Sequence, residues 1–131
     1  MDEKTKETIK IADQWVNYSN QSDIDGLSKV TSTPLELIGP KGAGKINLDE
    51  LNEWLKRAKL TLETVNRYAK NNFIVLEQRG TWLHEDNTVK GKGVVFTVFK
   101  VVDSRVCFLA RYDDLESAFN SSGLSEGDKV G

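Results

Sequence analysis

The C-terminal half of this 131-residue chain contains three long apolar segments, and their connections restrict the fold more than any other feature. The segments cover 73–82, 94–102 and 105–112, and only Asp103 and Ser104 separate the last two. A tight polar pair between two apolar runs predicts a β-hairpin. Strands joined by hairpins pair antiparallel, because a parallel pair needs a long crossover connection. This half of the chain therefore predicts an antiparallel meander.

The N-terminal half predicts helices. Apolar residues recur at helical spacing over 5–20, and a second long helix is expected over 48–59. Asn47 and Glu50 form a capping-box pattern at the start of the second helix. The sequence also predicts a short helix ending near residue 29, strands over 35–38 and 65–69, and a C-terminal helix over 114–120.

Helices that come first and a meander that follows indicate the α+β class rather than alternating βαβ units. A chain of this length forms one domain with its own core. We therefore expect residues 1–131 to form a single α+β domain, with its core over about 7–124 and a loose tail over 125–131.

Composition limits the partners and the location. The net charge is −2 and no basic face stands out, which weighs against nucleic acid. No apolar run of about 18 residues is present, so no membrane span is expected. One cysteine allows no internal disulfide, and the first fifteen residues are polar, so a cytoplasmic protein is expected. The single histidine, His84, has no cluster of ligands to join, and we expect neither metal nor cofactor.

The stretch from Gly39 to Lys45 fits the pattern G-x-x-x-x-G-K of a phosphate-binding loop. Two observations oppose that interpretation. Ile46 replaces the hydroxyl residue that would bind Mg²⁺, and Asn47 places the helix start two residues after the lysine. We interpret the stretch as a glycine-rich bend between a strand and a helix.

Two helices, a short strand, a third helix and then a long antiparallel sheet are expected in that order. This order resembles that of the nuclear transport factor 2-like superfamily, which includes the SnoaL-like polyketide cyclases and ketosteroid isomerase. Within it, the chain is similar to small bacterial proteins without established activity. The segments that carry this similarity are Gly39-Pro40-Lys41-Gly42-Ala43-Gly44, Glu53-Trp54-Leu55-Lys56-Arg57-Ala58, Val75-Leu76-Glu77-Gln78 with Trp82, and Arg111-Tyr112-Asp113-Asp114-Leu115 through Gly123-Leu124. The resemblance implies a cone, in which helices and a curved antiparallel or mixed sheet enclose an apolar pocket with one mouth. The aspartate base of the isomerase is missing, because the segment 30–37 contains only Glu36 as a carboxylate.

Glu77 is the candidate catalytic residue, because it interrupts an apolar strand. A carboxylate in such a place is either paired or shifted in pKa. It shares a face with Val75 and Arg79. Glu77 is therefore either a pocket base or an outward-facing residue bridged to an arginine.

Four large aromatic residues are candidates for lining the pocket: Trp15, Tyr18, Trp54 and Trp82. Burial in the core is the alternative for each of them.

Two arginines are candidates for contact with a ligand. Arg57 lies one turn from Trp54 and either packs on that ring or binds an anionic group over the mouth. Arg111 shares a strand face with Asp113, so it forms either a salt bridge or part of the pocket.

The strand over 94–102 is apolar on both faces, although a sheet with one wet face should alternate cleanly. A second copy of the chain would cover the outer face, which predicts a homodimer.

The function we expect is to bind or transform an uncharged or weakly anionic small organic molecule without a cofactor. If the protein is an enzyme, a lyase, isomerase or hydrolase fits best. The alternative is a non-catalytic dimeric interaction module whose cone is filled by its own side chains.

Overall fold

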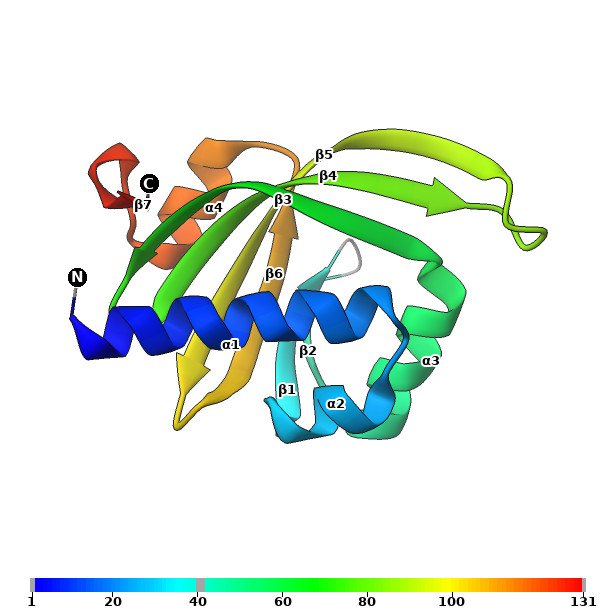
Figure 1. The fold of residues 1–131 in the computed structure, drawn as a ribbon, viewed down its shortest axis with the longest axis horizontal. Coiled ribbons are helices and arrows are strands. Elements are labelled where there is room, and N and C mark those ends of the chain that lie inside the picture. The colour runs from blue at the N-terminus through cyan, green and yellow to red at the C-terminus, as the bar shows by residue number, and fades with distance from the viewer. Residues whose placement is uncertain (1, 40–41, 131) are drawn as a thin grey trace.

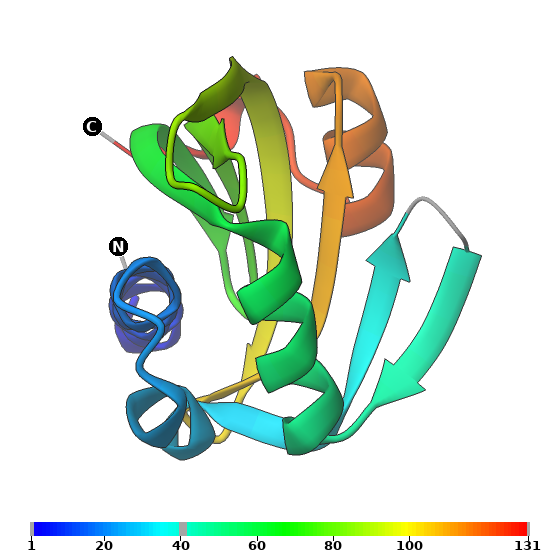
Figure 2. The same cartoon turned by 90° about the vertical axis from the view of Figure 1, so that its right-hand side faces the viewer.

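The computed structural model of the protein describes residues 2–39 and 42–130. One curved sheet runs through the molecule, with a long N-terminal helix along one face and a short C-terminal helix on the other (Figure 1, Figure 2). In chain order, the elements are α1 (Glu3–Asn20), α2 (Ile24–Lys29), β1 (Thr31–Gly39), β2 (Gly42–Ile46), α3 (Leu48–Ala58), β3 (Leu60–Lys70), β4 (Phe73–Leu83), β5 (Val89–Val102), β6 (Arg105–Tyr112), α4 (Leu115–Ser122), a 3-10 turn η1 (Glu126–Asp128) and β7 (Lys129–Val130).

The sheet has the strand order β2-β1-β6-β5-β4-β3-β7. The strands β1 and β6 pair parallel, and every other neighbouring pair is antiparallel. The expectation of an α+β fold with a mixed sheet is confirmed, as is the antiparallel C-terminal meander.

Left-handed turn residues explain the tight connections of the meander. Asp103 and Ser104 have φ values of 53° and 63°, the geometry that two-residue hairpin loops need. Asn71, with a φ of 57°, turns β3 into β4. Asparagine and aspartate adopt this conformation more easily than other non-glycine residues.

The sequence predicted that the glycine-rich stretch is a bend leading straight into a helix, and this prediction is wrong. Residues 42–46 form β2, which pairs antiparallel with β1 through Leu35↔Ile46 and Leu37↔Gly44. A phosphate-binding loop would need a helix to begin there, so that interpretation is excluded by the hairpin. Pro40 and Lys41, which follow β1 in the sequence, lie outside the described residues.

Two apolar clusters cover the two faces of the sheet. On the concave face, α1 packs Ala12, Trp15 and Val16 onto strand residues that include Ile74 and Phe99. On the convex face, α4 and the segment after it pack on the middle of the sheet. The buried residues of this outer cluster are Tyr68, Val75, Val98, Ala110, Ala118 and Leu124. Much of the second apolar face is therefore covered from within the chain.

The end of the chain is more ordered than the expected loose tail. The N–H and the hydroxyl of Ser125 donate to the Asp128 carboxylate at η1, and β7 then pairs with β3 through Arg67↔Val130 and Tyr68↔Lys129. The strand β3 is also longer than predicted, because it runs from Leu60 to Lys70.

Over the described part of the chain, no helix is long and apolar enough to cross a membrane. Within residues 2–39 and 42–130, no three histidine, cysteine, aspartate or glutamate side chains gather where they could hold a metal ion.

Candidate functional site

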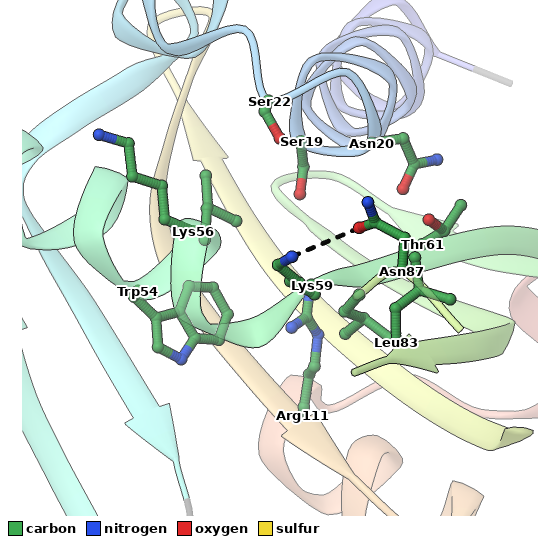
Figure 3. Close-up of a pocket in the computed structure, with 12 residues that line it drawn as sticks. Ser19, Asn20, Ser22, Trp54, Lys56, Lys59, Thr61, Leu83, Asn87 and Arg111 are labelled. Carbon is green, nitrogen blue, oxygen red and sulfur yellow. Dashed lines mark hydrogen bonds between the residues drawn. The ribbon is translucent and has the colours of Figure 1, made fainter. Parts of the chain in front are cut away.

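An open cavity of about 480 Å³ lies at the mouth of the cone, where the C-terminal end of α1, the helix α3 and the ends of β3 and β4 meet (Figure 3). It is partly polar and partly apolar. Its lining residues are Ser19, Asn20, Ser22, Trp54, Leu55, Lys56, Lys59, Leu60, Thr61, Leu83, Asn87 and Arg111.

Helix α3 forms one wall, and its ends are well defined. Asn47 and Glu50 complete the capping box that the sequence predicts, and buried Leu51 anchors the helix to the core. Lys59, with a φ of 41°, ends the helix in the left-handed conformation and turns the chain into β3. The wall bearing Trp54 is therefore fixed at both ends.

Two sets of hydrogen bonds hold the rim. The side chain of Asn20 donates to the Leu62 carbonyl at 2.8 Å and accepts from the Leu62 N–H at 2.9 Å. These two bonds fasten the end of α1 to β3. Lys59 Nζ donates to the Glu85 carbonyl at 2.7 Å and to Asn87 Oδ1 at 3.3 Å, which joins α3 to the β4–β5 loop (Figure 3).

A row of polar side chains crosses the concave face below the cavity, one from each of four adjacent strands. Gln78 Nε2 donates to Thr64 Oγ1 at 3.2 Å, and Gln78 Oε1 accepts from the Thr97 hydroxyl at 2.7 Å. Arg111 Nε donates to the same Thr97 oxygen at 3.3 Å. Gln78 and Thr97 have no exposed surface, so these bonds satisfy groups that water does not reach.

Arg111 ends this row and enters the cavity beside Trp54 (Figure 3). Its guanidinium carbon lies 5.1 Å from the centroid of the Trp54 ring, a cation–π distance. Burial lowers the pKa of the Arg111 guanidinium to about 10, so the group is still charged at neutral pH. Among the described residues, Arg111 takes part in no salt bridge.

Core side chains pack around Trp15 behind this mouth. Trp15 is fully buried, donates from Nε1 to Thr31 Oγ1 at 3.0 Å, and lies 5.2 Å from Phe99 between ring centroids. Trp15 therefore belongs to the core and does not line the cavity. The space open to a ligand lies between Trp54, Arg111 and the rim.

Of the residues predicted for the pocket, the structure brings Trp54 and Arg111 together in the cavity. Tyr18 packs instead on Gly26 of α2. Trp82 is partly buried and covers Gly80 on its own strand, β4, and Gly93 on the neighbouring strand, β5.

Glu77 lies on the opposite face of the sheet from the cavity. Its strand neighbour Val75 and its cross-strand partner Phe96 both belong to the outer cluster. Its carboxylate accepts from Asn66 Nδ2 at 3.2 Å, and its charge adds to burial in raising the pKa of Tyr68. Arg57 is exposed on α3, outside the residues that line the cavity.

Gln78 and Thr97 are the functional candidates that the sequence analysis missed. Each is a polar residue inside an apolar strand, which is the same signal that drew attention to Glu77. A shift of one residue along a strand moves a side chain to the other face, and the sequence pattern did not settle which face was inside.

A second cavity, of about 350 Å³, lies beside the β1–β6 pair and includes Lys100, Cys107 and Phe108. Burial raises the pKa of the Cys107 thiol, which disfavours the reactive thiolate. Cys107 Sγ donates to the Lys100 carbonyl at 3.5 Å, so the thiol is a structural group.

The lining of the mouth combines positive charge with apolar surface. None of the described residues that line it is Asp, Glu, His or Cys. Arg111, Lys56 and Lys59 supply positive charge, while Trp54, Leu55, Leu60 and Leu83 supply apolar surface. Such a wall can hold an organic molecule that is neutral or negatively charged.

No known family model matches the chain, and no curated protein matches it either. Solved structures do match. A protein described as a SnoaL-like polyketide cyclase, from Jannaschia sp. CCS1, aligns over 93% of this chain and 95% of its own, with a TM-score of 0.74 and 11% identity. An NTF2-like protein from Anabaena variabilis aligns over 87% and 94%, with a TM-score of 0.69 and 16% identity. An LEH-like epoxide hydrolase from M. tuberculosis aligns over 93% and 89%, with a TM-score of 0.66 and 18% identity.

Proposed function

We propose that this chain, which has the nuclear transport factor 2-like cone fold, holds a small organic molecule at the mouth of its cone without a cofactor. The observation that carries the proposal is the open cavity in which a charged Arg111 lies against Trp54. Its volume of about 480 Å³ falls within the range usual for small-molecule sites. Structural neighbours described as polyketide cyclases and an epoxide hydrolase support a small organic molecule.

The occupant is uncharged or weakly anionic, because the described lining residues bear positive charge and no carboxylate. Turnover as a lyase, isomerase or hydrolase would need a group that gives or takes a proton within hydrogen-bond reach. Glu77, the carboxylate that we considered for this role, is separated from the cavity by the sheet. We therefore favour binding over catalysis.

Thermal unfolding with a panel of apolar carbonyl compounds and organic acids tests the proposal. A ligand that binds only the folded chain adds about 2.7 kcal/mol of stability at a free concentration of one hundred times its Kd, so Tm rises. Thr61 is exposed and lines the cavity, and we expect Thr61→Trp to fill the mouth and abolish the rise.

The matched control is Glu63→Trp, which adds the same ring at an exposed position of β3 outside the cavity. It should leave the rise in Tm intact. A panel without any stabilising member, or a rise that survives Thr61→Trp, would rule out the cavity as the binding site.

A homodimer through the outer face of the sheet is a second proposal, and it corresponds to the interaction module considered above. Beyond the area under α4, that face presents Val94, which is 48% exposed, and the half-buried rings of Phe96 and Tyr112. The core packed around Trp15 also suits this alternative.

We expect light scattering at micromolar concentration to give a mass twice that of one chain. Val94→Lys should lower the measured mass toward that of one chain, because a charge in the centre of an apolar interface is costly to desolvate. Asn17→Lys adds the same charge at an exposed position of α1, on the opposite face of the sheet, and serves as the control. A wild-type protein that is monomeric under these conditions would contradict the dimer.

A further inference from the structure

Arg111 is held in a single orientation by contacts on two of its sides. The guanidinium carbon lies over the Trp54 ring, 5.1 Å from its centroid. The Nε atom donates to Thr97 Oγ1 at 3.3 Å. The Thr97 hydroxyl has already given its proton to Gln78 Oε1, so its oxygen is available only as an acceptor toward Arg111. The row from β3 to β6 therefore fixes both the position and the polarity of this contact.

The two terminal nitrogens of Arg111 remain free. Within residues 2–39 and 42–130, neither of them donates to a protein acceptor. No buried side-chain nitrogen or oxygen of these residues lacks a partner, so both terminal nitrogens retain some exposed surface, and Arg111 lines the cavity. They form a planar fork with two parallel N–H donors.

The surroundings leave the charge of this fork uncompensated. The described lining contains two further cations, Lys56 and Lys59, and no carboxylate. A cation that has lost much of its hydration without gaining an anion is unfavourable. An anion brought by the ligand would relieve that cost.

We propose that the ligand is an organic acid whose carboxylate accepts from both terminal nitrogens of Arg111. This deepens the proposed function and rests on it. A fork of two parallel donors matches the two oxygens of a carboxylate, and the planar bidentate pair is stronger than a neutral hydrogen bond. The apolar part of the acid lies toward Trp54, Leu55 and Leu60.

The same geometry makes Thr97 and Gln78 positioning residues for this contact. Thr97 is fully buried below the cavity and does not line it. Removing its hydroxyl takes away the acceptor for Arg111 Nε, so the fork loses its fixed orientation while the cavity wall keeps its shape. We expect the preference for acids to weaken without a change in the binding of neutral molecules.

Calorimetric titration of the full chain with matched pairs of an acid and its amide tests whether Arg111 binds a carboxylate. The probes are benzoate, 2-naphthoate and decanoate, each beside its primary amide. For the pairs that bind, the wild-type chain should prefer the acid by roughly tenfold to a hundredfold, the usual difference for a charge-assisted bidentate contact. Arg111→Gln should remove the preference and keep amide binding, Arg111→Lys should retain part of it, and Thr97→Val should reduce it.

Arg79→Gln is the control, because it removes an equal charge from an exposed residue on the far face of the sheet and should change nothing. The outcomes separate the two proposals. If no acid or amide binds, the proposed function fails. Equal binding of acid and amide, or a preference that persists in Arg111→Gln, leaves the cavity as a site but overturns the carboxylate. Tighter binding of phenyl phosphate than of benzoate overturns it as well.

Discussion

Replacing Trp15 by alanine is expected to lower the free energy of unfolding by about 3–5 kcal/mol, the usual cost of deleting a fully buried tryptophan. Trp15, which lies on α1, has no exposed surface, and its ring packs against Phe99. The substitution also leaves the Thr31 hydroxyl without the N–H that it accepts at 3.0 Å. Because native domains are stable by only about 5–15 kcal/mol, the variant would be close to unfolding.

Urea denaturation followed by far-ultraviolet circular dichroism measures this loss, since the signal does not depend on the deleted ring. Trp15→Phe should cost clearly less, because it keeps an aromatic ring and loses only part of the volume and the hydrogen bond. Trp54→Ala is the matched control for a tryptophan at the half-buried cavity wall. A loss in Trp15→Ala no greater than that in Trp54→Ala would contradict the assignment of Trp15 to the core.

Replacing Gly26 by alanine is expected to destabilise the protein by about 1–3 kcal/mol through overpacking. Helix propensity alone predicts the opposite sign, because alanine in a helix is favoured over glycine by about 1 kcal/mol. Gly26 is buried in α2 against the ring of Tyr18. An added Cβ would lie 2.6 Å from Tyr18 Cε1 and 2.8 Å from Cγ, which is closer than carbon atoms pack.

A double-mutant cycle with Tyr18→Ala isolates this clash. Without the tyrosine ring, Gly26→Ala should no longer destabilise and should follow helix propensity. Gly91→Ala is the control, because no atom lies within 4 Å of the Cβ it would add. Equal effects of Gly26→Ala in the two backgrounds would show that the ring is not the cause.

The elements that the sequence predicts well are those with a local signal. The capping box at Asn47 and the pair Asp103-Ser104 act over a few residues, and both are present as expected. The hairpin of β1 and β2 was missed, because its glycines are as suitable for a bend as for an edge strand. The pairing of β7 with β3 was missed for a different reason, since it joins Lys129 and Val130 to residues about sixty positions earlier.

The candidate site was predicted in part. Trp54 and Arg111 were identified as pocket residues and do meet, although they come from α3 and β6. The inner face of β4 was not identified, because Leu76, Glu77 and Gln78 offer a polar residue to either side. Val75 packs with α4 and Leu76 with α1, so burial distinguishes the faces only once both helices are placed.

The core and the cavity wall depend on different residues. The residues that hold the core, such as Trp15 and Phe99, do not line the cavity, and the lining residues Lys56 and Thr61 are exposed and have ordinary backbone conformations. Exposed positions of this kind accept substitution with little change in stability. Under the proposed function, exchange of these exposed residues would therefore change which molecules bind, while the stability of the scaffold stays nearly the same.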